Sequence, residues 1–322
     1  MTNTGELLAR IGFGCARLGG GVAERNSRRV VAAALKSGIR YFDTAPAYGG
    51  GASERILATA LRGCRDGVQV CTKVGLARAA PNRGAEVKTL ILAGIRSVLP
   101  EAAVARLNRM RHAQVQNLPK RASCGNFDAS FVRSSVAQSL QELQTEQLDC
   151  LLLHEPRLSD PSAELTAILH EFVAAGTLRR LGVATGSGYA NLPAFGDVAQ
   201  FKIGITAPSG CDTRTKIGHG LLRGMDQSRV ERCADQAGIF AQLPGLKFCR
   251  KEPLGSSALL LNAVLFATDL DRVLVSTTSP ARLEKFISVA LAIYGEIRAA
   301  DNVERAPLFG ALVRQYCNDS AQ

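Results

Sequence analysis

Short β-rich segments alternate with helix-like segments along almost the whole chain, and this alternation limits the fold more than any other feature. A β-rich segment is a run of apolar and β-branched residues, as in Leu148–His154, whereas a helix-like segment repeats its apolar residues at helical spacing, as in Ala163–Ala175. The segments that predict strands are the beginning of Ile11–Gly20, Ile39–Thr44, Val68–Lys73, Leu148–His154, Leu181–Thr185, Val198–Ile203, Lys216–Leu222 and Arg272–Thr277.

Several of the expected helices begin at residues suited to that position. Ser53 and Asp128 stand where they would cap helices, and Ser279 followed by Pro280 is typical of a helix start. Residues 201–228 leave little room for a sixth helix. The segments that predict helices are Arg28–Gly38, Ser53–Arg62, Phe131–Leu143, Ala163–Ala175, Arg229–Ala237, Ala258–Thr268 and Pro280–Ala292.

This order of elements predicts an α/β fold built from consecutive βα units around a parallel sheet. The chain has 322 residues, which is compatible with one large domain or two ordinary ones. About eight strands interleaved with helices in a chain of this length fit a single (β/α)8 TIM barrel spanning residues 1–322.

One stretch, Ala77–Asn126, interrupts the alternation after the third strand. We interpret residues 77–126 as a long insertion at the active-site face, because barrel enzymes build substrate sites from the loops that follow their strands. A disordered insertion is the alternative. Between Lys88 and Asn126 the basic residues outnumber a single acid, Glu101, so this stretch is either a basic surface near an anionic ligand or a solvated surface.

Composition narrows the class of protein. No apolar stretch is long enough for a membrane span or a signal peptide, and the nine cysteines include no C-x-x-C pair, so we expect a cytoplasmic protein with reduced thiols and no metal site. The net charge is +11, but the basic residues do not form Lys/Arg runs, and the chain has no Trp and few aromatic residues. We therefore expect neither nucleic-acid nor membrane partners, and a monomer or weak homo-oligomer.

Three of the apolar strands end in an ionisable residue: Asp43, Lys73 and His154. A charge at the end of a buried strand is costly unless it is paired, and the ends of parallel barrel strands converge at one rim. Tyr48 lies in the loop that follows Asp43. A carboxylate, an ammonium, an imidazole and a phenol are therefore expected around one mouth, although each alone has structural explanations such as helix capping.

Longer motifs in this order resemble the aldo-keto reductase family. The segment Phe42–Leu61 (FDTAPAYGGGASERILATAL) is the most specific of them. The sequence of Gly125–Leu140 resembles the branch of the family that includes aldose and deoxy-sugar dehydrogenases. The other matching segments are GFGCARLGG at Gly12–Gly20, VCTKVG at Val70–Gly75, SVAQSLQELQTEQLDCLLLHEP at Ser135–Pro156, LGVAT at Leu181–Thr185 and STTSPARLEKF at Ser276–Phe286.

The resemblance implies that Asp43, Tyr48, Lys73 and His154 form the acid–base set. Reduction of a carbonyl by hydride leaves an alkoxide that needs a proton, and Tyr48 is the implied donor. An ordinary tyrosine has a pKa of about 10, which the Lys73 ammonium is expected to lower. Asp43 is expected to pair with Lys73, and His154 to orient the carbonyl by a hydrogen bond or to assist proton transfer.

The resemblance also implies a nicotinamide cofactor, NADP or alternatively NAD. The Gly12–Arg17 segment lacks the third glycine of a dinucleotide fingerprint, so the phosphates are expected at the last strand and the helix after it. Family residues at Thr185 and Gln200 would hold the nicotinamide carboxamide. The implied phosphate-binding residues are Ser276, Thr277, Thr278 and Arg282.

The chain departs from the family pattern at several of these places. Ala184-Thr185 replaces a common Ser-Asn pair, Ser276 replaces a lysine found in relatives that prefer NADP, and Lys285-Phe286 replaces a Glu-Asn pair. The expected function is a NAD(P)-dependent oxidoreductase acting on a small aldehyde, ketone or aldose. The alternative is a cofactor-binding barrel with little turnover that acts as a redox sensor or partner subunit.

Overall fold

The computed structural model describes residues 3–19, 23–78, 125–186, 193–203, 214–300 and 303–318. Most of the long insertion expected at 77–126, including its basic residues, lies outside the described residues. The described chain contains eight strands, all of which begin or end within a few residues of their predicted places. They are β1 (Ile11–Gly14), β2 (Tyr41–Asp43), β3 (Gln69–Val74), β4 (Cys150–His154), β5 (Leu181–Ala184), β6 (Val198–Lys202), β7 (Thr215–His219) and β8 (Arg272–Val275).

The strands form one closed barrel in which each strand pairs in parallel with the next, and β8 closes the ring by pairing with β1. The register aligns residues at the carboxyl ends, for example Gly14 with Asp43 and His154 with Ala184. The predicted (β/α)8 barrel is therefore confirmed, and its parallel register brings the residues that end each strand to one rim.

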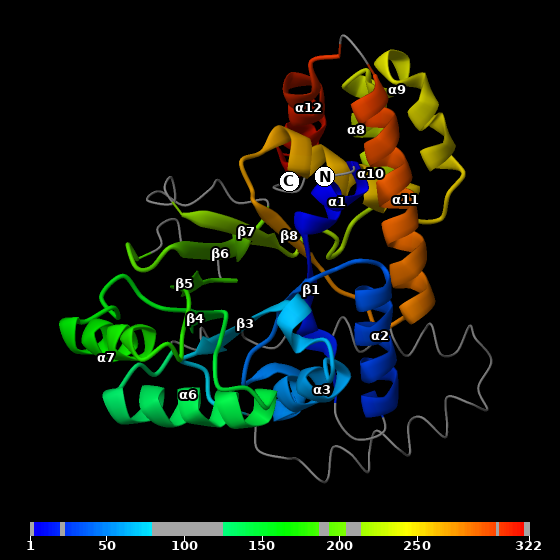
Figure 1. Ribbon diagram of the computed structural model, residues 1–322. Coiled ribbons are helices and arrows are strands. Elements are labelled where there is room, and N and C mark those ends of the chain that lie inside the picture. Colours follow the sequence, from blue (N-terminus) through cyan, green and yellow to red (C-terminus); the bar gives the residue numbers. More distant parts are fainter. Residues whose placement is uncertain are drawn as a thin grey trace, which may run out of the picture.

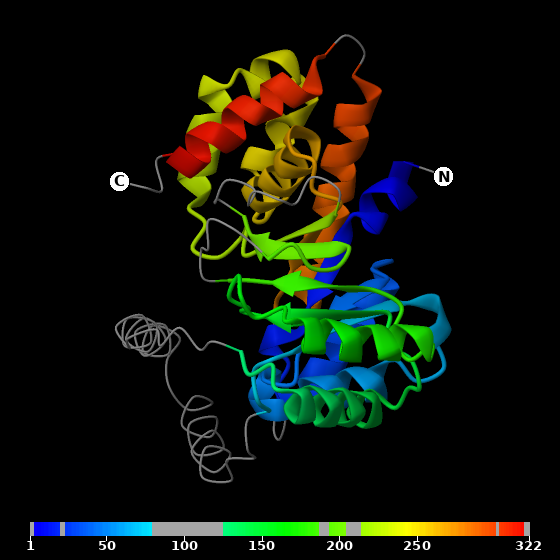
Figure 2. The same cartoon turned by 90° about the vertical axis from the view of Figure 1, so that its left-hand side faces the viewer.

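Helices lie on opposite sides of the barrel in both views (Figures 1 and 2). Those of the C-terminal third, α8 to α12, gather at one end of the view, while α3, α6 and α7 cover the opposite side (Figures 1 and 2). The α-helices are α1 (Asn3–Ala9), α2 (Glu24–Lys36), α3 (Ser53–Ala60), α6 (Ala129–Leu143), α7 (Ala163–Ala174), α8 (Gln227–Gln236), α9 (Ile239–Gln242), α10 (Gly255–Ala267), α11 (Pro280–Ala299) and α12 (Arg305–Asn318).

The helix predictions are confirmed in part. Ser279 caps α11 by accepting a hydrogen bond from the Arg282 backbone N–H, with Pro280 in the first turn, as predicted. The sequence did not indicate α1 or α12, because α1 is short and a proline and a glycine interrupt the pattern of α12. The little room predicted for a sixth helix within 201–228 concerns a stretch whose residues 204–213 lie outside the described residues.

Two predicted caps are wrong. Asp128 stands at the cap position of α6, but its side chain accepts no capping hydrogen bond. Ser53 is the first residue of α3 rather than its cap, and it is completely buried. Its hydroxyl instead bonds the Thr44 hydroxyl at 2.9 Å and the Cys15 carbonyl at 3.1 Å, because a buried hydroxyl needs partners wherever the packing places it.

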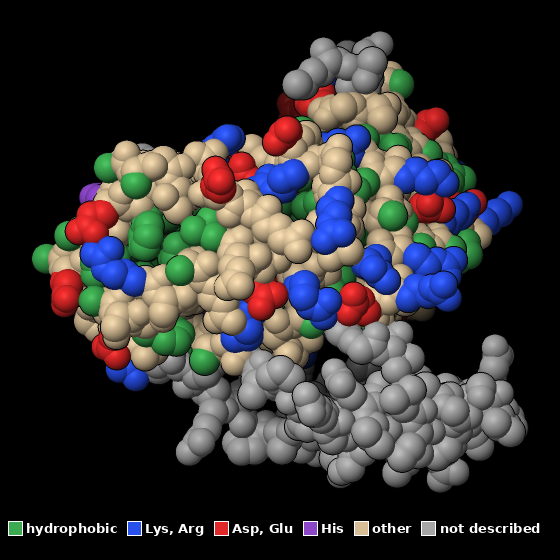
Figure 3. All heavy atoms as spheres, turned by 60° about the horizontal axis from the view of Figure 1, so that its bottom comes forward, with side chains coloured by type: hydrophobic (Ala, Val, Ile, Leu, Met, Phe, Trp, Pro, Cys, Tyr) green, Lys and Arg blue, Asp and Glu red, His purple; other side chains and the backbone are tan. Residues whose placement is uncertain are grey.

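Two apolar layers hold the barrel together. An inner cluster fills its interior, with Leu152 completely buried at the centre of β4, and a larger outer cluster lies between strands and helices. Many charged side chains lie on the surface: on the face in Figure 3, Lys and Arg side chains are interspersed with Asp and Glu. In the part of the chain that the structure describes, no helix is long and apolar enough to cross a membrane.

The inner layer predicts a stability effect for Leu152→Ala. Because Leu152 is 0% exposed, the substitution leaves a cavity and should lower the free energy of unfolding by about 2–5 kcal/mol. The matched control is Leu158→Ala at a side chain that is 63% exposed, where the change should stay within about 0.5 kcal/mol. Urea unfolding followed by circular dichroism measures both, and equal losses would contradict the described packing.

Candidate active site

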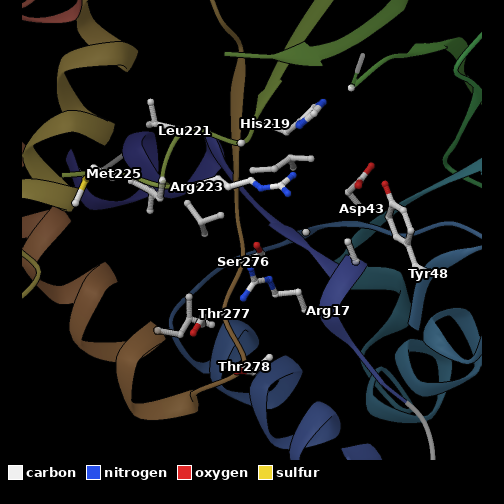
Figure 4. Close-up of a pocket in the computed structure, with 18 of the residues that line it drawn as sticks. Arg17, Asp43, Tyr48, His219, Leu221, Arg223, Met225, Ser276, Thr277 and Thr278 are labelled. Carbon is white, nitrogen blue, oxygen red and sulfur yellow. The ribbon is translucent and has the colours of Figure 1, made fainter. Parts of the chain in front are cut away.

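The carboxyl ends of the strands open into a cavity of about 900 Å³. All ten predicted site residues line it, coming from β2, β3, β4 and β6, from the segments that follow β2, β5 and β8, and from the first turn of α11. Asp43 and Tyr48 lie on one side of the cavity in Figure 4, whereas Ser276, Thr277 and Thr278 lie on another. The parallel barrel thus brings together residues that are up to 239 positions apart, Asp43 and Arg282.

Asp43 and Lys73 form a buried ion pair beneath the cavity. The Lys73 ammonium donates to Asp43 Oδ1 at 2.7 Å and to the Thr44 carbonyl at 2.9 Å, and both side chains are almost fully buried. Burial lowers the pKa of Lys73, but the negative charge of Asp43, followed by Tyr48, Cys71 and the hydrogen bond to Asp43, together outweigh it. The net direction is upward, so Lys73 stays charged at any ordinary pH.

Tyr48 begins a short 3-10 segment, Tyr48–Gly51, and four residues separate it from the end of β2. Gly49 has a φ of +61°, and a Cβ there would lie 1.7 Å from the Leu18 carbonyl oxygen, so only glycine allows this close turn. The following helix is anchored by Glu54, whose buried carboxylate accepts from Thr72 and pairs with Arg78. The sharp turn and this anchor hold Tyr48 at the rim.

Lys73 and His154 both lie against Tyr48. The Lys73 Nζ atom is 4.9 Å from the centre of the Tyr48 ring, and the rings of Tyr48 and His154 meet edge to face with centres 5.8 Å apart. Burial raises the pKa of Tyr48, Lys73 lowers it and Asp43 raises it again, and the net direction is upward. The predicted lowering of the Tyr48 pKa is wrong. Lys73 does lower this pKa, but burial and Asp43 raise it by more.

His154 is a neutral imidazole at physiological pH. Burial, followed by the positive charge of Lys73 and the neighbouring His219, lowers the pKa of His154 to about 3. Its Nδ1 atom is buried and finds no hydrogen-bond partner among the described residues. A neutral imidazole keeps one N–H group, which can be donated to a ligand oxygen.

Thr185 directly follows β5 and lies beside Gln200 in the middle of β6. The Thr185 hydroxyl donates to Glu155 Oε2 at 3.1 Å, and the Gln200 side-chain amide donates to Asp43 Oδ1 at 2.9 Å. The Thr185 backbone N–H also bonds the Gln200 backbone carbonyl at 3.0 Å. Thr185 and Gln200, which were predicted to hold a carboxamide, therefore already donate hydrogen bonds to the carboxylates of Glu155 and Asp43.

Hydroxyl groups gather where β8 meets α11. Ser276, Thr277 and Thr278 line the cavity just before the N-terminus of α11, and Arg282 in the first turn of that helix lines the same space. The Thr278 carbonyl accepts from Asn26 at 2.7 Å, which ties this loop to α2. Lys285 points away to an ion pair with Glu252 at 2.7 Å, while Phe286 lines the cavity.

Arg17, Glu155, His219 and Arg223 also line the cavity, although no motif in the sequence indicated them. Arg17 and Arg223 project into the cavity (Figure 4). No ion pair joins Arg17, Arg223 or Arg282 to a carboxylate among the described residues. The position of Arg17 in the turn after β1 was a signal available in the sequence, whereas Arg223 follows a strand with weak patterning.

Comparison with known proteins identifies the family. The sequence model of the Aldo/keto reductase family matches residues 10–190, more than half of the chain, so the chain belongs to that family. It is 30% identical over 193 residues to the aldo-keto reductase YhdN of Bacillus subtilis (58% of this chain, 46% of that protein). It is 29% identical over 189 residues to a D-threo-aldose 1-dehydrogenase of Pseudomonas (56% and 51%).

The chain spans about half the length of these curated relatives in the matched region. Among solved structures, the holo form of an aldo-keto reductase from Bacillus halodurans superposes with a TM-score of 0.58. This match covers 96% of this chain and 91% of that one at 19% identity. At that identity the likeness shows the shared fold alone.

The cavity fits the nicotinamide cofactor that the family resemblance implies. Three arginines without a described carboxylate partner, several hydroxyls and a helix N-terminus form an anion-binding surface at one part of the cavity. At the other part, the side chains of His154, Thr185 and Gln200 line the cavity with polar groups that suit a ring substituent. A dinucleotide carries both kinds of group, anionic phosphates and a polar amide.

The lowered pKa of His154 predicts an acid-sensitive stability. Between about pH 3 and 6.5 the unfolded chain binds a proton at this imidazole that the folded protein does not, so the free energy of unfolding falls as the pH falls below 6.5. The loss from this group is about 1.4 kcal/mol per pH unit.

We therefore expect His154→Asn to lose less stability than the wild type between pH 6.5 and 5. Urea midpoints measured across this range test the difference, with His170→Asn on the exposed side of α7 as the matched control. Parallel pH curves for the wild type and the His154 variant would contradict burial of a neutral imidazole.

Proposed function

We propose that the protein is a nicotinamide-dependent oxidoreductase that interconverts a small carbonyl compound and its alcohol. The observation that carries the proposal is the meeting of Tyr48, His154 and the buried Asp43–Lys73 pair at the floor of one cavity. Family membership supports it, and the likeness to a D-threo-aldose 1-dehydrogenase supports an aldehyde, ketone or aldose as substrate.

In this proposal the chain supplies the proton chemistry and the bound cofactor supplies or accepts the hydride. Tyr48 donates its phenolic proton to the substrate oxygen as negative charge develops there. The Lys73 ammonium, 4.9 Å from the ring, stabilises the resulting tyrosinate. Neutral His154 donates a hydrogen bond that orients the substrate oxygen, and Asp43 keeps Lys73 charged and in place.

The raised pKa of Tyr48 favours the reductive direction. A phenol that holds its proton through neutral pH is a ready donor to an alkoxide, whereas oxidation of an alcohol needs the tyrosinate as base. We therefore expect reduction to proceed at neutral pH and oxidation to require alkaline pH.

NADP is the proposed cofactor, with NAD accepted. Ser276, Thr277, Thr278 and the start of α11 would receive phosphate oxygens, joined by the guanidinium groups that line the cavity, Arg17, Arg223 and Arg282. Arg282 supports NADP because it adds a cation beside the first turn of α11. Ser276 stands where relatives that prefer NADP carry a lysine, and this difference supports the acceptance of NAD as well.

The remaining proposals concern the whole chain. We propose one barrel domain over residues 1–322, with residues 77–126 as an insertion near the active-site face, and a monomer or weak homo-oligomer. The seven cysteines that the structure describes are all thiols, which supports a cytoplasmic location.

Tyr48→Phe should lower kcat for carbonyl reduction at least about 100-fold, because the substitution removes the proposed proton donor and keeps the ring. The matched control is Tyr41→Phe, the same chemical change in the barrel interior away from the cavity, which should retain the wild-type kcat. Steady-state rates on a panel of aldehydes and sugars provide the measurement. Wild-type turnover by purified Tyr48→Phe would refute the assignment.

Fluorescence titration with NADPH and NADH, together with the same panel, separates the enzyme from a cofactor-binding barrel with little turnover. Binding of a nucleotide with turnover on at least one substrate is the expected result. Binding without turnover on a broad panel would instead favour the sensor or partner subunit.

Arg282→Ala should raise the Kd for NADPH about 10- to 100-fold and change the Kd for NADH less than about threefold, because a charge-assisted hydrogen bond contributes about 1.5–3 kcal/mol. The control is Arg298→Ala on the same helix, where the guanidinium pairs with Glu6 outside the cavity. Equal weakening of both nucleotides would show that Arg282 contacts a phosphate common to both, or that it only packs α11.

A further inference from the structure

We propose that Glu155 is a positioning residue that makes the nicotinamide amide subsite an acceptor of hydrogen bonds. Through Glu155 and Asp43, the Thr185 hydroxyl and the Gln200 side chain turn their oxygen atoms toward the ligand, so that the subsite selects a primary amide N–H. This inference rests on the proposed function and adds to it the chemical group that the subsite recognises.

Glu155 binds two neighbouring donors at the end of β5. Its Oε2 atom accepts from the Thr185 hydroxyl at 3.1 Å, and its Oε1 atom accepts from the Gly186 backbone N–H at 2.6 Å. A carboxylate oxygen can only accept, so the hydroxyl proton of Thr185 is directed at Glu155. Toward any other partner the same hydroxyl offers its lone pairs.

The backbone of Glu155 is strained to reach this position. Its φ is +55°, a left-handed conformation that few residues other than glycine adopt and that costs about 1 kcal/mol or more. Glu155 follows His154 directly, and its N–H bonds the Ala184 carbonyl at 2.8 Å. The residue after a strand end is thereby turned so that its carboxylate lies beside Thr185 rather than in solvent.

Two further contacts hold Thr185 in a single orientation. Its backbone N–H donates to the Gln200 carbonyl at 3.0 Å, and its carbonyl lies 2.9 Å from His219 Nε2. Because a carbonyl only accepts, His219 carries its proton on Nε2, and burial lowers the pKa of this imidazole so that it remains neutral. Thr185 is thus tied to β4, β6 and β7 at once.

The Gln200 side chain, like that of Thr185, directs its hydrogen-bond donor at a carboxylate. Its Nε2 atom donates to Asp43 Oδ1 at 2.9 Å, and a carboxylate on that side identifies the amide nitrogen and turns the amide oxygen elsewhere. Lys73 donates to the same Asp43 oxygen at 2.7 Å and holds this carboxylate in place. Two carboxylates, Glu155 and Asp43, therefore orient the donors of two neighbouring side chains in the same way.

Gly186 shows how closely this subsite is packed. A Cβ atom at position 186 would lie 3.2 Å from Glu155 Oε1 and 3.7 Å from His219 Cε1. A side chain there would push on the carboxylate that receives the Gly186 N–H. The glycine allows Glu155 to approach the backbone and aim its second oxygen at Thr185.

The two acceptor oxygens, Thr185 Oγ1 and Gln200 Oε1, suit the NH2 group of the nicotinamide carboxamide. A primary carboxamide carries an NH2 group that can donate to Thr185 Oγ1 and Gln200 Oε1, whereas an acetyl group of nearly equal size has a methyl there. An Asn in place of Thr185, as in many relatives, offers both a donor and an acceptor and has no fixed polarity. Tighter binding of the carboxamide cofactor than of its acetyl analogue therefore measures how far Glu155 turns Thr185 into a hydrogen-bond acceptor.

The test compares the Kd of NADP⁺ with that of its 3-acetylpyridine analogue by isothermal titration calorimetry, which needs no turnover. We expect the wild type to bind the amide form about 5- to 10-fold more tightly, as one hydrogen bond supplies. Glu155→Gln has one acceptor oxygen for two donors, so the ratio should fall to about twofold or less. Thr185→Val should give the same fall.

Glu171→Gln is the matched control, since Glu171 pairs with Arg133 on the outer helices, and it should keep the wild-type ratio. General damage to the fold weakens both ligands together and leaves their ratio unchanged, so the ratio separates positioning from packing. A wild type that binds both forms equally, or Glu155→Gln and Thr185→Val variants that keep the full ratio, would overturn the inference. A wild type that binds neither form would instead refute the proposed function.

Discussion

The buried ion pair between Asp43 and Lys73 is the interaction on which the site depends. Two charges inside a barrel are tolerated only when they are paired and hydrogen-bonded, and here Thr44 and Gln200 complete the bonding. Removal of either partner would leave an uncompensated buried charge, at a cost of about 3–5 kcal/mol. The pair also sets the electrostatics of Tyr48 and His154, because both side chains lie against Lys73.

The cavity divides into two regions of opposite character. Toward α11, arginines, hydroxyls and backbone N–H groups present donors, while toward β5 and β6 the oxygens of Thr185 and Gln200 are turned outward by carboxylates. A ligand that fits both regions must be anionic at one end and donate hydrogen bonds at the other. This division explains why a basic chain keeps Glu155 and Asp43 in a cavity that otherwise attracts anions.

Much of this arrangement could be predicted from the sequence because it depends on local patterns. The strand that ends at His154 is a continuous apolar run, and Ser279-Pro280 is a strong helix start, so both elements fall where the patterns place them. The cap at Ser53 failed because a capping residue type does not reveal whether its side chain is drawn into the core, whereas Asp128 stands at the cap position without a capping hydrogen bond from its side chain. The direction of the Tyr48 pKa failed because burial and Asp43 act together against Lys73.

The sequence by itself determined the barrel, the order of its strands and the ionisable residues at their ends, since periodicity and motif spacing are properties of neighbouring residues. Only the tertiary structure decided which distant groups meet. It placed Arg17 and Arg223 in the same cavity as Arg282, and it turned Glu155 toward Thr185 through a left-handed backbone conformation. Hydrogen-bond polarity and pKa depend on every charge within a few ångströms, whatever its position in the chain, and closure of the barrel alone brings those charges together.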